Sequence, residues 1–271
     1  MKDRRPSRLA VYGHLVRAQV KSQAQYRTSL AIDVGGSMAL GVLDILSVVV
    51  FFRATSALAG FAFHEVFLMT TLASCAFSVA DLAVGNVERL RVYVRTGLFD
   101  AVLVRPLGTL LQLLAMDVAP RRVGRLVFGV ALIATAAVQA RVLPTPAHLV
   151  LLVITPLAGA VIFSAVFVAT STVSFWWIEA GEFANALTYG GHDFAAYPLG
   201  IYGALLRRMF AYGLGFAFVA YYPALALLDR PDPLKAPAYL GYASPLIALG
   251  AAAIAALFWR RGVRHYRSTG S

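Results

Sequence analysis

Hydrophobic residues are concentrated in six long runs of this chain, and polar residues gather between the runs. The runs cover about residues 30–52, 63–86, 123–140, 148–171, 209–228 and 239–259. A helix of ~20 apolar residues crosses the ~30 Å hydrocarbon core of a bilayer, and lipid offers the backbone no other hydrogen-bond partner. The pattern therefore predicts an all-α polytopic membrane protein with six transmembrane helices.

Basic residues lie mainly in alternate connections between these runs. Of the 24 Lys and Arg residues, twenty fall in parts of the chain that this topology puts on the same side as both termini. The other side holds only Arg53, Arg141, Arg230 and Lys235. Cytoplasmic loops carry the excess of Lys and Arg in membrane proteins. We therefore expect a multi-pass protein of the cytoplasmic (inner) membrane, with both termini in the cytoplasm.

The net charge bears on which partners to expect. A formal charge of +11 would suggest a nucleic-acid partner in a soluble protein. Here the basic residues lie beside the ends of predicted helices, where they meet anionic lipid headgroups. We therefore expect membrane lipid, and no nucleic acid, as a partner. A composition of 59% hydrophobic and 14% charged residues agrees with a polytopic membrane protein.

The chain is expected to form a single transmembrane domain over residues 1–271. An arm at 1–29 carries apolar residues at roughly helical spacing, at Leu9, Tyr12, Leu15, Val16 and Val20. Both an amphipathic helix at the cytoplasmic headgroups and a simple topological anchor fit this arm. The longest predicted connections, 87–122 and 172–208, are assigned to the cytoplasm. Neither is long enough for a nucleotide-hydrolysing domain, which needs ~100 to 200 residues.

Motifs for catalysis are missing from the sequence. A phosphate-binding loop needs a Gly-rich turn leading to Lys and Ser or Thr, whereas Gly35-Gly36-Ser37 lacks the Lys and lies within an apolar run. The five histidines are scattered, without the spacing of a metalloprotease site, and no serine lies in a GxSxG frame. We therefore expect no enzyme activity, no metal site and no cofactor in this chain.

Two carboxylates interrupt the first apolar run. Asp44 lies well inside it and Asp33 lies near its cytoplasmic start. A charged group at the bilayer centre costs ~2.5 to 3.5 kcal/mol on insertion scales, so it normally faces a cavity or a partner. Asp44 could line a translocation pathway or relay protons. It could equally be protonated, or satisfied by hydroxyl groups, where two helices meet.

A short segment after the second run resembles a known family. Residues 97–107 read GLFDAVLVRPL, a turn followed by a short helix with an apolar face and a stop before proline. This G-x-x-D-x-x-L-x-R-P-L pattern is similar to that of the permease subunits of six-helix ABC-2 type exporters. Weaker likeness extends over nearly the whole chain, at Gln25-Tyr26-Arg27, Tyr197-Pro198 and the stretch 218–224.

The resemblance implies a function and a set of partners. Such permeases form a homodimeric or heterodimeric pathway, and two separate ATPase subunits bind ATP and Mg²⁺. The connection after the second span rests on the ATPase, so Gly97, Asp100, Arg105 and Pro106 become candidate coupling residues. The glycines around Gly213 stand where relatives are expected to carry proline, which leaves the geometry of the fifth span open.

Alternative interpretations remain at this stage. Arg105 could simply bind lipid phosphates and Pro106 could simply end a helix. A self-sufficient ion-coupled transporter using Asp44 and Asp33 is the alternative function. The scarcity of intramembrane charges and the lack of a recognisable repeat with broken helices argue against it. Lipids, glycans, peptides and drugs all suit an apolar, aromatic pathway as substrates.

Overall fold

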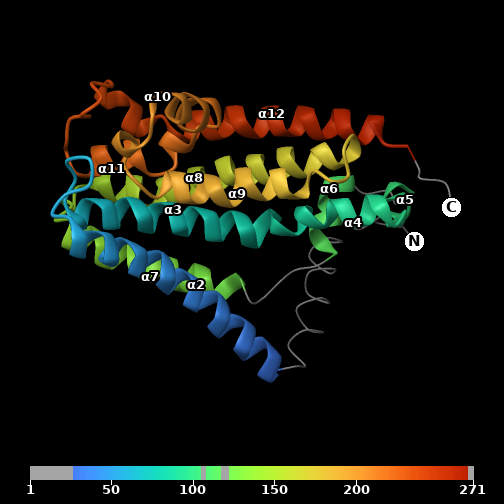
Figure 1. Ribbon diagram of the computed structural model, residues 1–271, viewed down its shortest axis with the longest axis horizontal. Helices are drawn as coiled ribbons and strands as arrows, with labels where there is room; N and C mark the ends of the chain where they lie inside the picture. Colours follow the sequence, from blue (N-terminus) through green and yellow to red (C-terminus); the bar gives the residue numbers. More distant parts are fainter. Residues whose placement is uncertain (1–26, 105–107, 117–121, 268–271) are drawn as a thin grey trace, which may run out of the picture.

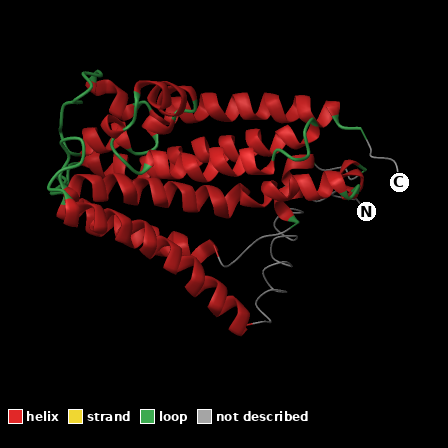
Figure 2. Ribbon diagram, in the orientation of Figure 1, coloured by secondary structure: helices red, strands yellow, loops and turns green. Residues whose placement is uncertain are grey.

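The computed structural model describes residues 27–104, 108–116 and 122–267, and the side chain of Asp33 is not among the atoms described. The predicted amphipathic arm therefore lies outside the described residues, except for its last few positions. Helices form most of the described chain, and no strand occurs within those three ranges (Figure 2). This confirms the predicted all-α class.

Among the described residues, five helices are long and apolar enough to cross a membrane. They are α2 (Arg27–Ala54), α3 (Phe63–Val84), α7 (Arg122–Gln139), α8 (Pro146–Thr172) and α12 (Ser244–His265). Four of them match predicted runs to within a few residues. The helix α12 begins five residues later than predicted, since residues 238–242 form a separate 3₁₀ turn and Pro245 suits the first turn of a helix.

The helices α3 and α8 form the centre of the bundle (Figure 1). Phe77 of α3 packs edge-on against Phe163 of α8, with ring centroids 5.3 Å apart. A Cβ atom on Gly159 would lie 2.9 Å from the Cβ of Ala76, so the missing side chain lets the two helices approach closely. By contrast, the first turns of α2 diverge from the bundle toward one side, whereas α7 stays packed on α3. Both helices expose apolar residues such as Val42 and Val127.

The predicted cytoplasmic connection 172–208 is wrong, because part of it crosses the bundle. Helix α9 (Gly181–Ala195) runs beside α8 and α3 from one end of the bundle toward the other. Just beyond its last turn, the carbonyl of Ala196 accepts a hydrogen bond from Thr70, 3.0 Å long. The ring of Tyr197 packs against Phe51, near the end of α2. The connection therefore ends on the side opposite to the one predicted.

The predicted fifth span is not one helix. Residues Ala204–Gly213 and Phe216–Leu227 form two helical arms bent by 68°. Gly215, at the bend, has φ +78°, a left-handed conformation that glycine adopts without steric cost. The break falls where the sequence already departed from the family pattern. It also weakens one argument against an ion-coupled transporter, which rested on the lack of a recognisable repeat with broken helices.

Both arms return to the same end of the bundle. Before the first arm, Tyr202 donates to the carbonyl of Phe194 at the end of α9. After the second arm, Arg230 binds Glu65 at the start of α3, 2.6 Å away, and the carbonyl of Gly60. The segment is therefore a re-entrant pair, and α9 takes its place as the fifth crossing. Within the described residues, the five long helices together with α9 then give six crossings.

We call this end the α11 end, after helix α11 (Tyr221–Leu227), and the opposite one the α5 end, after helix α5 (Leu98–Leu103). The corrected path moves Arg207 and Arg208 to the α11 end. Six basic residues then lie there instead of four, namely Arg53, Arg141, Arg207, Arg208, Arg230 and Lys235. The remaining excess still favours the α5 end as the cytoplasmic one.

Candidate functional site

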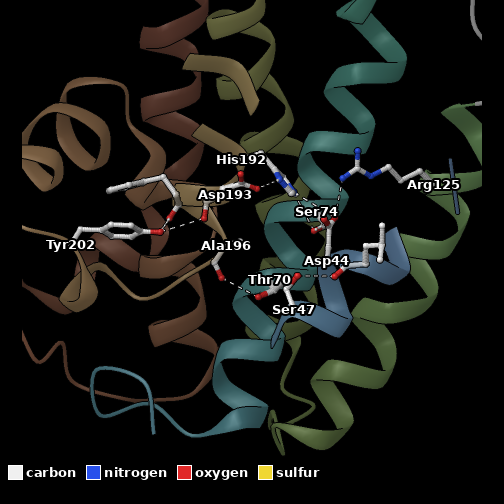
Figure 3. Close-up of polar contacts among 11 residues, drawn as sticks. Asp44, Ser47, Thr70, Ser74, Arg125, His192, Asp193, Ala196 and Tyr202 are labelled. Carbon is white, nitrogen blue, oxygen red and sulfur yellow. Dashed lines mark hydrogen bonds and ion pairs between the residues drawn. The ribbon is translucent and has the colours of Figure 1, made fainter. Parts of the chain in front are cut away.

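Asp44 lies at a junction of four helices (Figure 3). Its carboxylate pairs with Arg125 of α7 at 2.9 Å and accepts a hydrogen bond from Ser74 of α3 at 3.3 Å. The Ser74 hydroxyl also lies 3.2 Å from Nε2 of His192 on α9, and that nitrogen is 3.9 Å from the Asp44 carboxylate. We call these four residues the Asp44 cluster. It connects α2, α3, α7 and α9 by polar contacts.

The Asp44 cluster lies deep in the bundle, and this depth explains why the Asp44 carboxylate needs a charged partner. Asp44 is ten residues before the end of α2 and Ser74 eleven after the start of α3, about 15 Å from the α11 end at ~1.5 Å per residue. That depth is close to the middle of a ~30 Å hydrocarbon core. A charge there needs an opposite charge or strong hydrogen bonds, and Arg125 supplies the opposite charge.

Three of the four cluster residues, Ser74, Arg125 and His192, were not predicted from the sequence. The charge count puts Arg125 among the twenty basic residues on the cytoplasmic side, although α7 begins at Arg122 and carries it one turn inside. His192 falls in the predicted connection 172–208, whereas the structure places it on helix α9. A signal was available in the sequence: Asp44 lies in the first predicted span and Arg125 in the third, and intramembrane charges pair with one another.

A second ion pair marks the α5 end. Asp81 of α3 binds Arg122 of α7 at 3.1 Å, and Arg122 also donates to the Asp81 carbonyl. A Cβ on Gly85 would lie 2.1 Å from the Asp81 carboxylate, so only glycine leaves room for this contact. The two pairs, Asp81–Arg122 and Asp44–Arg125, hold α7 against α3 and α2 along one side.

The predicted coupling segment forms a separate helical element at the α5 end. After α3, a 3₁₀ turn and helix α4 (Leu90–Arg95) continue to Gly97, which has φ +71°. Helix α5 then begins, with Asp100 in its first turn. No atom lies within 4 Å of a Cβ built on Gly97, so its backbone conformation alone calls for glycine. Arg105 and Pro106 lie outside the described residues.

Helix α5 buries one face and exposes the other. Phe99 and Val102 are fully buried. Leu98, at the start of α5, and Val104, directly after its end, are 52% and 84% exposed. An exposed apolar face on a short helix outside the spans is typical of a surface that another molecule covers.

The buried face of α5 joins two transmembrane helices through an aromatic cluster. The Phe99 ring lies 5.2 Å from that of Phe175, which follows α8, and 5.0 Å from that of Tyr266, which follows α12. Phe175 also packs edge-on against Trp259 of α12 at 5.6 Å. We call Phe99, Phe175, Trp259 and Tyr266 the Phe99 cluster. Burial, and then the nearby Asp100, raise the pKa of the Tyr266 phenol, so it stays neutral at physiological pH.

Helix α6 (Thr109–Ala115) fixes the other side of the segment. The Thr109 hydroxyl accepts a hydrogen bond from the indole of Trp259, 3.3 Å long. Asn86, just after α3, donates to the carbonyl of Leu113 at 2.7 Å. The described parts of the connection, 87–104 and 108–116, are thus packed on the ends of α3, α8 and α12 and do not form a hydrophilic loop.

Comparison with protein families decides the class of this chain. A family model described as ABC-2 family transporter protein matches residues 38–270. The chain belongs to the ABC-2 transporter family. It is accordingly a membrane-spanning permease of an ABC transporter, and permeases of this family generally work with ABC ATPase subunits. Comparison with curated proteins and with solved structures gave no match.

In this ABC-2 permease the two groups of predicted residues lie far apart. The Asp44 cluster lies at mid-depth, and the α4–α5 segment lies at the α5 end (Figure 1). Within the described ranges, no group of three His, Cys, Asp or Glu residues is placed to hold a metal ion. Two features are therefore available for a transport mechanism. They are the polar contacts of the Asp44 cluster and the packed α4–α5 segment at the α5 end.

Proposed function

We propose that the chain is one half of an exporter driven by two separate ATPase subunits. A second copy of the chain, or a homologous permease, supplies the other half of the translocation pathway. The ATPase subunits bind ATP and Mg²⁺, and this chain contributes no catalytic group. The α5 end faces the cytoplasm, as the excess of basic residues there favours.

The Phe99 cluster is the observation that carries the coupling proposal. An ATPase that covers the exposed face of α5, at Leu98 and Val104, would push on a helix whose buried face already contacts the ends of α8 and α12. Packed aromatic rings transmit such a displacement because protein interiors are dense and shift between discrete arrangements. Gly97 gives the turn its conformation, while Asp100 and Arg105 supply charged groups for the partner.

The Asp44 cluster is proposed as the part of the pathway wall that rearranges during transport. Asp44 and Arg125 pair across α2 and α7, and α2 is the helix whose first turns diverge from the bundle. Separating these helices would free an aspartate and an arginine at mid-depth to face a polar substrate group. Asp33, on the same helix, is retained as a second pathway residue.

An ion-coupled mechanism is the second candidate, and the contacts of His192 favour it. The histidine shares a serine with a mid-depth carboxylate, and chains of Asp, Glu and His within the membrane form the proton relays of pumps and transporters. Transport by the purified chain alone in vesicles, driven by a proton gradient without ATP, would establish this mechanism. We expect no such transport.

Two measurements test the ATPase-driven proposal. Purification in mild detergent should recover an ABC ATPase with this chain, in equal numbers of ATPase and permease subunits. Arg105→Glu should abolish ATPase-coupled export and leave membrane insertion intact, because it reverses a charge at the proposed contact. Unchanged export by this variant would remove Arg105 from the coupling surface.

A further inference from the structure

A lateral groove runs along α12 and belongs to neither site described above. Its volume is about 440 Å³, and it lies between α8, α9, the bend of the re-entrant pair and α12. Representative lining residues are Val166, Val173, Leu187, Leu214, Ile254 and Phe258. The lining α12 residues extend from Leu246 to Phe258, a length of about 18 Å at ~1.5 Å per residue. Such a groove has the length of a fatty-acyl chain.

The groove wall offers an occupant almost no polar group. Its two hydroxyl-bearing members already have partners: Thr170 donates to the carbonyl of Val166, and the Tyr212 hydroxyl lies 3.1 Å from that of Tyr222. The wall is also open to lipid, since Leu246 and Ile254 are 71% and 70% exposed. The chemistry therefore selects a hydrocarbon chain and disfavours a polar or charged ligand inside the groove.

The α5 end of the groove has a different character. Arg261 lies three residues after Phe258, and His265 seven after it, so both continue the groove face of α12. Trp176 stacks on Phe258 at 5.4 Å and on His265 at 5.3 Å. Tryptophan at this level is typical of the headgroup region, and arginine binds phosphate through paired hydrogen bonds.

The charged residues at the α5 end of the groove favour an anionic headgroup. The last turns of α12 carry exposed cations at Arg260, Arg261 and Arg264. The acidic side chains near the start of α9 are Glu179 and Glu182, which are also exposed. The cations outnumber the carboxylates, and Arg261 is the one that continues the groove face.

From these observations we propose that the groove binds one acyl chain of an anionic phospholipid, whose phosphate lies at Arg261. The lipid comes from the leaflet at the α5 end. It would fill the space between α12 and the bend at Gly215, and so support the re-entrant pair. This proposal does not depend on the ATPase-driven function.

The test measures retention of phosphatidylglycerol relative to phosphatidylcholine by the purified full chain, by native mass spectrometry from mixed micelles. We expect a preference for phosphatidylglycerol that Arg261→Glu reduces about fivefold or more, the effect of one basic group at an anionic surface. The matched control is Arg141→Glu, a charge reversal at the α11 end, which should leave the preference unchanged.

A second pair of variants tests the groove itself. Gly250 lines the groove and no atom lies within 4 Å of a Cβ built there, so Gly250→Phe would fill it. Gly36→Phe adds the same ring at an open position on α2. Gly250→Phe alone should reduce retention of both lipids.

Three results would overturn the proposal. The first is equal retention of the two lipids by the unmodified chain, which would show general wetting by lipid. The second is full retention in Gly250→Phe. The third is a loss of dimers in Gly250→Phe with no change in bound lipid, which would assign the groove to a second copy of the chain.

Discussion

At the scale of single residues, the backbone conformation of Gly97 explains why the sequence pattern has a glycine at this position. The resemblance to ABC-2 permeases singled it out, and its φ of +71° explains why: a left-handed residue starts α5. Asp44 is the opposite case, because its position was predicted and its partners were not. A carboxylate within an apolar run signals that a partner exists. Only the folded arrangement of α7 and α9 identifies Arg125 and His192.

Replacing Gly97 tests the backbone requirement. A left-handed conformation costs a residue with a Cβ roughly 1 to 2 kcal/mol, so Gly97→Ala should lower the thermal stability slightly and coupled transport strongly. Gly108→Ala is the control, because Gly108 has φ −61° and equally open space around its Cβ. Equal behaviour of the two variants would show that the turn at Gly97 is not required.

A double-mutant cycle tests the intramembrane ion pair. Asp44→Asn leaves Arg125 without its charged partner in a partly buried site, so it should destabilise the protein by roughly 2 kcal/mol, below the full cost of a buried unpaired charge. Arg125→Gln in the same chain should recover part of that loss. Unfolding in detergent monitored by circular dichroism would measure it, and strictly additive losses would rule out direct pairing.

At the scale of elements, helices that are apolar along their whole length could be predicted from the sequence, and helices with polar residues or a break could not. The helices α2, α3, α7 and α8 are continuous apolar runs, and their bounds followed from length and hydropathy. Helix α9 was missed because Thr188, His192 and other polar residues lower its hydropathy, although these side chains bond within the bundle. The stretch 209–228 was misassigned because hydropathy does not register the break at Gly215.

The coupling element makes its own prediction. Phe99→Ala removes a fully buried ring from the contact of α5 with α8 and α12, which should cost about 3 kcal/mol or more if the cavity stays open. ATP hydrolysis by the complex should then continue while transport falls, since the ATPase would still bind the exposed face of α5. Leu98→Ala, at a half-exposed position on that face, should instead weaken ATPase binding.

The Phe99 experiment separates coupling from folding. Both rates are measured on complexes purified to the same monodispersity, and Phe99→Leu serves as the variant that keeps most of the apolar volume. Parallel loss of ATP hydrolysis and transport in Phe99→Ala, with rescue of neither by Phe99→Leu, would contradict a coupling role for the cluster.

At the scale of the whole molecule, the path of the chain through the membrane is the main correction to the sequence prediction. With Cys75, the only cysteine, replaced by alanine, single cysteines can report sidedness. Arg208→Cys should react with a membrane-impermeant maleimide from the same side as Arg141→Cys and opposite to Arg91→Cys. Labelling of Arg208→Cys from the side of Arg91→Cys would restore the predicted straight fifth span.

The central claim is that an ATPase docks on the exposed face of α5, and cross-linking in intact cells tests it most directly. A photoreactive amino acid replaces Val104, which is 84% exposed directly after α5, or Val138, which is 78% exposed near the α11 end. The account predicts an adduct at position 104 that contains an ABC ATPase, identified by mass spectrometry, and none at position 138. Adducts with lipid alone at position 104, or the same adducts at both positions, would contradict it.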